Sequence, residues 1–339
     1  MRAICYDRFG AASDVLSIQE FDTPPPGPGD VTVALSYSGV NPSDAKARAG
    51  LRPGVTKPPF PQIIPHSDGA GRVEAVGDGV DAKRVGERVW IYNGQWQRAF
   101  GTAAQKITLP SEQAVPLPDA ISDRDGATLG IPGLTAAQTV FGGGDVAGQT
   151  LLISGGAGAV GHTAVQLAAW GGAQVIATSS GAAMDDVRAA GAAHVFDYAD
   201  PDLAAKILET AQGAGIDRAV EVEFGQNAEL LTQVMRPLGT IATYGSGKEM
   251  APAMPFGPMM FKALKIDITL IYILPPAPRA AAIARLHEAI TTGGLTPRID
   301  RVYDFEDCAS AQDGVMKPGR KGAEIGRHTS ELQSPVPSS

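Results

Sequence analysis

Three glycines stand at GxGxxG spacing directly after the apolar run TLLIS, at Gly156, Gly158 and Gly161. Glycine at the first two positions lets the backbone turn tightly and lets a pyrophosphate approach, and the third lets a helix pack closely on a strand. The free N–H groups at the start of that helix then face the phosphates. The spacing predicts a dinucleotide site at Gly156, Gly158, Ala159, Val160 and Gly161, with a merely flexible loop as the alternative.

The type of dinucleotide depends on the residues about 20 positions further on, where NAD-binding chains usually carry an acid for the ribose 2′-hydroxyl. This chain reads ATSS there, ending in Ser179 and Ser180. A carboxylate would repel a 2′-phosphate, whereas small hydroxyls leave room and donate hydrogen bonds to it. The pattern therefore favours NADPH over NADH. Arg188, on the helix that follows, is either a cationic partner for the phosphate or an ordinary surface residue.

The elements that position this turn alternate between strand and helix. Continuous apolar runs, which are typical of strands buried on both faces, are separated by segments with helical spacing. The runs cover residues 150–154, 174–180, 194–198, 217–224 and 239–245, and a further one covers 267–276. This alternation predicts a doubly wound parallel sheet with helices on both sides. Before about residue 123 the pattern changes to short β-prone runs separated by turns.

Composition limits the partners of the chain. Its 339 residues carry 28 Lys and Arg against 36 Asp and Glu, so the net charge is -8, which disfavours nucleic acid and anionic membranes as partners. The apolar stretch near residues 266–274 is interrupted by Asp267 and is too short to span a bilayer. Only two cysteines occur, Cys5 and Cys308, which fits a reducing compartment. We therefore expect a cytoplasmic protein of two domains.

Six longer segments carry a family pattern. They are SGVNPSDAKARAG (38–50), SDGAGRVEAVGDGV (67–80), GERVW (86–90), LGIPGLTAAQTVF (129–141), GGAGAVGHTAVQLAAWGGAQVIAT (155–178) and GAAHVFDY (191–198). With them the chain resembles the zinc-free quinone oxidoreductase branch, the zeta-crystallin-like group, of the medium-chain dehydrogenase/reductase superfamily. The resemblance implies an α/β fold in which a GroES-like β-barrel catalytic domain accompanies a Rossmann NADPH-binding domain, with the active site in the cleft between them.

The domain boundaries follow from this resemblance and from the element pattern. We expect the catalytic domain to comprise residues 1–124 and 275–326, and the Rossmann domain to comprise 125–274. The ending GRKGAEIG departs from the hydrophobic last strand of the family, so the last barrel strand is expected to be absent or altered. Residues 327–339 are polar and rich in Pro and Ser, and we expect them to form a disordered tail.

Metal ligands of the sister alcohol dehydrogenases are missing from the matching positions. Asn41 stands where those enzymes have a cysteine, Ser67 and Asp68 replace their His-Glu pair, and His66 is isolated. We therefore expect no metal site. Without a zinc ion to polarise an oxygen, alcohol oxidation is poorly supported. A conjugated acceptor is different, because it can delocalise the charge that a hydride brings, so that positioning can supply most of the catalysis.

Individual roles are carried over from the family residue by residue. Asn41 and Asp44, in NPSD, match its cleft motif, and Thr135 matches a residue beside the nicotinamide, although a turn and a helix cap are the alternatives. Tyr92 is expected either to line the acceptor site or to belong to the barrel core. The resemblance, together with the expected strand ends, adds these cofactor-binding residues: Tyr198, Gly245, Ser246 and Arg320, with Lys317 as a second basic candidate.

These observations predict an NADPH-dependent quinone oxidoreductase that reduces quinones or activated α,β-unsaturated carbonyls. Two alternatives stay open: a reductase of acrylate-type or enoyl-CoA C=C bonds, and a non-catalytic, crystallin-like NADPH-binding protein. Many relatives have a tyrosine shortly after the NPxD motif, where this chain has Lys46 and Arg48, which weakens the enoyl alternative. The family resemblance also suggests a homodimer joined along residues 267–276, whose unpaired strand edge needs a partner.

Overall fold

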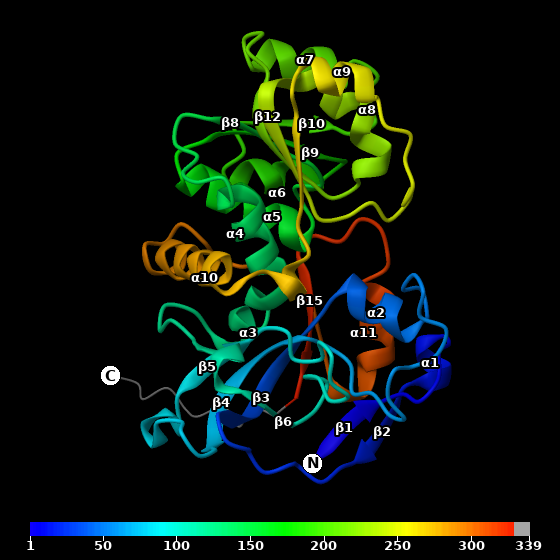
Figure 1. Cartoon of the computed structure of the whole chain (residues 1–339), viewed down its shortest axis with the longest axis vertical. Helices are drawn as coiled ribbons and strands as arrows, with labels where there is room; N and C mark the ends of the chain where they lie inside the picture. Colours follow the sequence, from blue (N-terminus) through cyan, green and yellow to red (C-terminus); the bar gives the residue numbers. More distant parts are fainter. Residues whose placement is uncertain (329–339) are drawn as a thin grey trace. The chain divides into compact units, whose positions relative to one another are not determined.

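The computed structural model describes residues 1–328 and divides into two compact units. Among the described residues, unit 1 contains Met1–Ile131, Ile299–Pro318 and residues 323–328, and unit 2 contains Pro132–Arg298 and Gly319–Gly322. In Figure 1 the blue and cyan parts of the sequence belong to unit 1 and the yellow part to unit 2, whereas the orange and red parts are divided between the two units. Both ends of the sequence therefore contribute to the same unit.

Unit 1 is built around an antiparallel sheet with the strand order β14-β15-β3-β4-β5-β7, in which β6 also pairs with β3. The long strand β3 pairs with β4 along one edge and with β6 and β15 in succession along the other. Apolar side chains at alternate positions, such as Val31, Val33 and Leu35, point into a buried core. The strands are β3 (Asp30–Val40), β4 (Asp68–Val76), β5 (Arg88–Ile91), β6 (Lys106–Pro110), β7 (Ala114–Pro116), β14 (Ile299–Tyr303) and β15 (Ala323–Arg327).

A two-stranded sheet and short helices complete unit 1. The sheet joins β1 (Arg2–Cys5) to β2 (Ser17–Glu20) in antiparallel pairing. The helices are α1 (Ala12–Val15), α2 (Pro42–Arg48), α3 (Asp123–Gly126) and α11 (Cys308–Gly314).

Unit 2 contains a six-stranded sheet in the order β10-β9-β8-β11-β12-β13, and every pairing is parallel. Its central strand β8 is almost inaccessible to solvent, since Leu151, Leu152 and Ile153 are at most 1% exposed. The strands are β8 (Thr150–Ile153), β9 (Gln174–Ser179), β10 (His194–Asp197), β11 (Ile216–Glu221), β12 (Met235–Thr243) and β13 (Lys265–Ile268). The predicted doubly wound parallel sheet is confirmed.

Seven helices accompany this sheet in the described part of the chain, and the strand order reverses at β8, which lies between β9 and β11. Loops at the carboxyl ends of parallel strands form ligand sites at such a switch point. The helices are α4 (Leu134–Phe141), α5 (Ala159–Trp170), α6 (Ala183–Ala189), α7 (Leu203–Thr210), α8 (Phe224–Val234), α9 (Phe256–Phe261) and α10 (Pro276–Thr291) (Figure 1).

The unit boundaries differ from the predicted domains at residues 275–298. This segment, expected in the catalytic domain, belongs to unit 2. Helix α10 has a buried stripe that includes Leu286 and Ile290, and it packs against α4 and α5. The Trp170 indole donates a hydrogen bond to Thr292 Oγ1 at 3.0 Å. The apolar stripe of α10 is therefore buried against helices of unit 2. The boundary between the first segment of unit 1 and unit 2 also differs from the prediction, since it lies after residue 131 and not after residue 124.

Two strands near the end of the chain also differ from expectation. Only Asp267 and Ile268 of the run 267–276 lie in a strand, at the end of β13, and a 3-10 turn over Ile271–Ile273 follows. The last barrel strand, expected to be absent or altered, is present as β15 between β14 and β3. Arg327 ends that strand and His328 is only 7% exposed, so the predicted tail cannot begin at residue 327. Its remainder, 329–339, lies outside the described residues. Within 1–328, no helix has the length and apolar character needed to cross a bilayer.

Candidate functional site

The glycine turn follows β8 at the switch point of the unit 2 sheet. Gly155 has a φ of +66°, and Gly158 is the N-cap of α5. A Cβ at Gly161 would overlap the carbonyl oxygen of Gly155, and a Cβ at Gly156 would lie 2.9 Å from Val187 Cγ1. Gly156 and Gly161 are therefore needed for the packing of strand, turn and helices.

Gly158 is different, because the protein itself leaves the space beside it open. A Cβ there would meet only the Gly155 carbonyl oxygen, at 3.5 Å, which is an ordinary van der Waals distance. A hydrogen bond fixes the turn to strand β9, because the Gly156 N–H donates to the Thr178 carbonyl at 2.8 Å. Backbone N–H groups at the start of α5 thus border a cradle that suits the pyrophosphate of a dinucleotide.

The neighbouring strand ends carry short polar side chains. Ser154 accepts a hydrogen bond from the Val222 N–H at 3.1 Å and so links the ends of β8 and β11. Ser179, which ends β9, is buried, and its carbonyl accepts from the Tyr198 N–H at 3.3 Å. The structure therefore brings Ser179 and Tyr198 together, and their role at a 2′-phosphate stays a prediction. The Tyr198 side chain is exposed, which leaves its hydroxyl accessible to a ligand.

The loop after β12 places Gly245 and Ser246 beside the end of β11, where the Gly245 carbonyl accepts from the Phe224 N–H at 3.0 Å. Ser246 Oγ accepts from the Gly225 N–H at 2.8 Å, so this hydroxyl orders the start of α8. At the same edge lies Glu221, which the sequence did not single out. Burial raises the pKa of Glu221, and its carboxylate accepts from Asn227 Nδ2 at 3.0 Å.

The two candidate basic residues separate between the units. Lys317 belongs to unit 1, whereas Arg320 lies in the short segment Gly319–Gly322 that joins unit 2. Lys321 anchors this segment, because its Nζ lies 2.9 Å from Asp186 Oδ2 on α6. Arg298 Nη2 lies 3.0 Å from the same oxygen. Arg320 is thus held near the helix that follows Ser179, and Lys321 is a second cation there that the sequence analysis missed.

In unit 1, Asn41 lies at the N-cap of α2 between two buried carboxyl groups. Its backbone N–H donates to Asp44 Oδ2 at 2.8 Å, and its side-chain Nδ2 donates to Asp68 Oδ2 at 2.7 Å. The three residues are 5%, 4% and 0% exposed. Burial raises the pKa of Asp44 to about 7, and burial together with the nearby Asp44 raises the pKa of Asp68 well above its usual range. The predicted Asn41–Asp44 pair is therefore part of a buried polar cluster that also contains Asp68.

Thr135 and Tyr92 are both buried. Thr135 is the second residue of α4 in unit 2, and its carbonyl accepts from the Thr139 hydroxyl at 2.7 Å. Tyr92 in unit 1 is only 4% exposed, and its ring centroid lies 6.2 Å from that of Trp90. This burial matches the core interpretation of Tyr92 that the sequence left open.

His66 is held as a neutral side chain in unit 1. Its Nδ1 lies 2.9 Å from Ser38 Oγ, and its Nε2 lies 3.2 Å from Gln312 Nε2. Burial lowers the pKa of His66 to about 3. Cys308 Sγ is 4.0 Å away, and burial raises the pKa of its thiol to about 12, which disfavours the thiolate that a metal would need. Across residues 1–328, no group of three or more His, Cys, Asp or Glu side chains could hold a metal ion.

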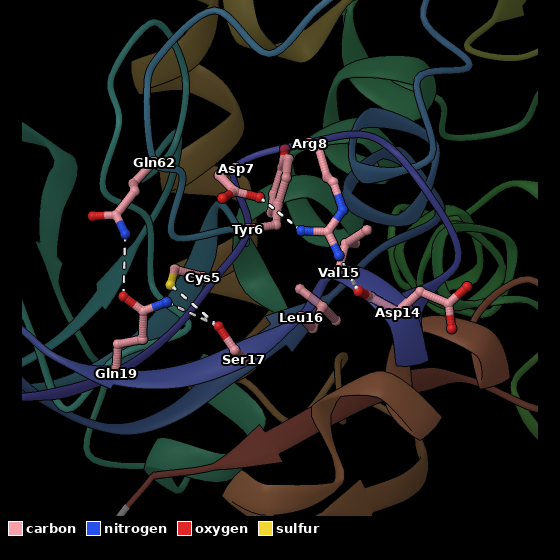
Figure 2. Close-up of a pocket in the computed structure, with 10 residues that line it drawn as sticks. All are labelled: Cys5, Tyr6, Asp7, Arg8, Asp14, Val15, Leu16, Ser17, Gln19 and Gln62. Atoms are coloured by element: carbon pink, nitrogen blue, oxygen red, sulfur yellow. Dashed lines mark hydrogen bonds and ion pairs between the residues drawn. The ribbon is translucent and has the colours of Figure 1, made fainter.

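Two cavities lie apart from these residues. Figure 2 shows one of about 210 Å³ in unit 1, where the Gln19 amide donates to Ser17 Oγ at 3.0 Å and the Gln62 amide donates to Gln19 at 3.1 Å. Burial raises the pKa of Cys5 in its wall, so the thiol form is favoured there. The other, of about 500 Å³, is lined by Arg218 and by residues near the amino ends of β12 and β13. None of the predicted site residues lines either cavity.

Family models match both units. The alcohol dehydrogenase GroES-like domain matches residues 27–119, and the zinc-binding dehydrogenase domain matches residues 159–287.

Individual relatives match over nearly the whole chain. The quinone oxidoreductase of Mus musculus is 31% identical over 321 residues, covering 93% of this chain and 94% of the relative. The synaptic vesicle membrane protein VAT-1 homolog of Homo sapiens is 29% identical over 348 residues, covering 95% and 85%. The solved structure of Escherichia coli quinone oxidoreductase complexed with NADPH has a TM-score of 0.82 at 23% identity, covers 96% of this chain and 100% of that one, and supports the fold. The chain therefore belongs to the quinone oxidoreductase, or zeta-crystallin-like, branch of the medium-chain dehydrogenase/reductase superfamily.

Proposed function

We propose that this oxidoreductase uses NADPH to reduce quinones or activated α,β-unsaturated carbonyls and needs no metal ion. The observation that carries the proposal is the glycine turn at the start of α5 and at the switch point of a parallel sheet, where a Cβ at Gly158 would meet only the Gly155 carbonyl oxygen at 3.5 Å. Packing requires glycine at positions 156 and 161 but leaves position 158 free, which suits a turn shaped for a pyrophosphate. When bound there, NADPH supplies the hydride.

The choice of NADPH over NADH rests on the end of β9. Ser179 and Ser180 are small hydroxyl residues at the position where an acid would accept from a ribose 2′-hydroxyl. Arg320 and Lys321 add positive charge in the segment that Asp186 holds against α6. In this proposal the hydroxyls, Tyr198 and these cations receive the 2′-phosphate. The NADPH complex of the Escherichia coli neighbour supports the same choice.

The acceptor side rests on Asn41, whose amide and backbone are both fixed by hydrogen bonds. A conjugated acceptor delocalises the incoming charge, so the chain needs to orient the two reactants rather than polarise an oxygen with a metal. Such orientation can supply about 7 to 11 kcal/mol of the barrier. In unit 1, Asn41 and Asp44 are the residues that we propose orient the acceptor, and in unit 2 we propose that Thr135 orients the nicotinamide.

Metal independence is supported by the residues at the matching ligand positions. Asn41, Ser67 and Asp68 replace the cysteine and the His-Glu pair, and the Asp68 carboxyl is already engaged by two N–H donors. We expect activity to survive EDTA dialysis, and elemental analysis to find less than about 0.1 zinc per chain. Loss of activity on EDTA that zinc restores would contradict this part of the proposal.

We also propose a homodimer joined along β13. This strand is the last on its side of the described sheet, and Ile268 on it is 78% exposed. An unpaired apolar strand edge is a natural template for a second copy. Sedimentation should therefore find dimers, and Ile268→Lys should shift them toward monomers. A wild-type chain that sediments only as a monomer would contradict the dimer.

The central test is an acceptor screen that follows NADPH absorbance with 1,4-benzoquinone and 9,10-phenanthrenequinone, with NADH in parallel. A Gly158→Asp variant should lose at least about 100-fold in kcat/KM, because its carboxylate would occupy the cradle and repel the phosphates. Gly257→Asp is the matched control, since a Cβ there meets nothing within 4 Å and the charge change is the same. Faster reduction of an enoyl-CoA or acrylate would select the C=C reductase alternative, and tight NADPH binding without turnover would select the crystallin-like one.

A further inference from the structure

The larger of the two cavities lies at the amino ends of strands in the unit 2 sheet, and we call it the amino-end cavity. Its volume is about 500 Å³, and its walls come from the loop after α4 and from early residues of β11, β12 and β13. These strands run parallel to β8, whose carboxyl end carries the glycine turn. A molecule in the amino-end cavity would therefore occupy a different end of the sheet from a dinucleotide on that turn.

Arg218 is a buried cation in the wall of this cavity, with an exposed fraction of 6%. Its Nε donates to the Thr139 carbonyl, and its Nη2 lies 3.4 Å from Asp267 Oδ2. Within residues 1–328, Nη1 has no hydrogen-bond acceptor. Burial lowers the pKa of Arg218, and the nearby Asp267 offsets this effect only in part. An oxygen acceptor that came from outside the protein would therefore stabilise the buried guanidinium.

Glycine at position 143 leaves the space in front of Arg218 Nη1 open. A Cβ at Gly143 would lie 2.8 Å from Nη1 and 3.8 Å from Cζ, and apart from the adjoining residues no other heavy atom lies within 4 Å of it. A separation of 2.8 Å is a hydrogen-bond distance. Gly143 has no positive φ, so its backbone conformation does not require glycine. The missing side chain thus gives an acceptor access to Nη1.

The carboxylates in the wall are already paired with cations. The pairs are Asp145 with Arg285, Asp217 with Arg236, and Asp267 with Arg218. Lys265 also lines the cavity, and in the described part of the chain no carboxylate lies within ion-pair distance of it. Arg218 pairs with Thr240 and Thr240 with Lys265 across the sheet, so their side chains lie on one face. The cavity therefore has one positive charge in excess.

This charge balance selects the kind of anion. One excess positive charge suits a monoanion, whereas a phosphate dianion would bring a second negative charge close to three carboxylates. Only one guanidinium nitrogen is available, so a bidentate contact with Arg218 is excluded while Nε and Nη2 keep their partners. Apolar residues of the wall, among them Val140, Val146 and Leu238, can pack against a short alkyl body.

We propose that the amino-end cavity binds a small organic monocarboxylate, whose oxygen accepts from Arg218 Nη1 and whose charge is paired with Lys265. The inference does not depend on the proposed function, because no residue that we assign to NADPH or to its acceptor lines this cavity. The alternative is that Arg218 only fixes the end of α4 to the sheet through the Thr139 carbonyl.

Sodium hexanoate is the probe, and its binding can be followed by saturation-transfer NMR at low ionic strength. We expect saturable binding with a Kd below about 1 mM. The neutral 1-hexanol should bind at least about 10-fold more weakly, because it cannot pair with a buried cation. Inorganic phosphate should displace hexanoate only above about 10 mM.

Three substitutions test the residues that carry the proposal. Gly143→Ala places a methyl group against Nη1, and Lys265→Gln removes the excess charge, so each should weaken hexanoate binding at least about fivefold. Asp267→Asn removes a competing negative charge and should tighten binding at least about threefold. The last two keep the test decisive if Gly143→Ala fails to fold.

Two matched controls should stay within about twofold of wild type. Gly257→Ala is the glycine control, since a Cβ there meets nothing within 4 Å, and Lys83→Gln removes the charge of an exposed lysine in unit 1. Gly158→Asp should also bind hexanoate as wild type does, because the glycine turn lies at the other end of the strands.

Several results would overturn the inference: binding that does not saturate, equal affinity for 1-hexanol, tighter binding of phosphate, or variants that match their controls. Loss of hexanoate binding in Gly158→Asp would also overturn it, because the carboxylate would then lie at the glycine turn. A chain that binds hexanoate as described but reduces no acceptor with NADPH would contradict the proposed function alone.

Discussion

The glycine turn of unit 2 and the polar cluster of Asn41, Asp44 and Asp68 in unit 1 are held in their conformations by different interactions. Around the turn, side chains are absent, and the packing of Gly156 and Gly161 leaves backbone N–H groups facing an open cradle. Around Asn41, buried carboxyl groups hold the side chain and backbone in place through hydrogen bonds. Burial raises the pKa of both Asp44 and Asp68. The first arrangement depends on shape and the second on charge, so pH should affect the second far more than the first.

The largest expected effect sharpens this contrast through pH. The pKa of Asp44 is about 7 in the folded chain against an ordinary value of 3.8, so folding favours its protonated form. The stability that Asp44 contributes is present below about pH 4 and is lost as pH rises through 7. Asp44→Asn lacks this titration. The free energy of unfolding of wild type relative to Asp44→Asn should therefore fall by up to about 4 kcal/mol between pH 4 and pH 7.5.

Urea unfolding of both proteins at several pH values measures this difference. The matched comparison is Gly158→Ala, whose stability relative to wild type should vary little with pH, because the added methyl group carries no charge and would meet only the Gly155 carbonyl oxygen at 3.5 Å. If the difference in free energy of unfolding between wild type and Asp44→Asn stays constant across this pH range, burial does not raise the pKa of Asp44 in the folded chain.

A smaller effect should separate the two kinds of glycine within the turn. Gly161→Ala should lower the free energy of unfolding by about 1 to 3 kcal/mol, because its Cβ overlaps the Gly155 carbonyl oxygen. Gly158→Ala should cost less than about 1 kcal/mol and act mainly on NADPH affinity. Thermal unfolding with and without NADPH measures both effects, and equal destabilisation by the two variants would contradict the distinction.

The smallest expected effect concerns Lys321, a charged residue of unit 2 that we propose lies at the 2′-phosphate site. Lys321→Ala removes a partly exposed ion pair with Asp186, so stability should change by less than about 1 kcal/mol. NADPH binding should weaken about three- to tenfold while NADH binding stays the same, because only NADPH carries the 2′-phosphate. Fluorescence titration with both nucleotides makes the comparison, and equal weakening of both would remove Lys321 from the phosphate site.

Sequence patterns predicted unit 2 better than unit 1, for a physical reason. The turn and its flanking strand and helix are contiguous, so residues 150–170 carry the whole pattern. Asp68 and Asn41 are 27 positions apart, and only the register of β3 against β4 brings them together. The sequence predicted Asn41 and Asp44 from a local motif, but it could not indicate that Asp68 completes the cluster.

The errors near the end of the chain have a similar origin. Helix α10 shows an apolar stripe in the sequence, but the stripe alone does not say which layer it covers. Strand β15 has a weak strand pattern because Glu324 and Gly326 interrupt it, yet pairing with both β14 and β3 compensates. Glu324 is 3% exposed, so this strand buries a charged residue that a sequence pattern assigns to the surface.

The placement of β15 also determines the order in which the chain can fold during synthesis. All six strands of the unit 2 sheet precede Arg298, so this sheet can assemble before the later residues leave the ribosome. The large sheet of unit 1 must wait for Ala323–Arg327, and until then the edge of β3 between Tyr37 and Val40 stays unpaired. A nascent chain stalled before residue 323 would expose that edge, and an unpaired strand edge is a template on which the strand of another chain can pair.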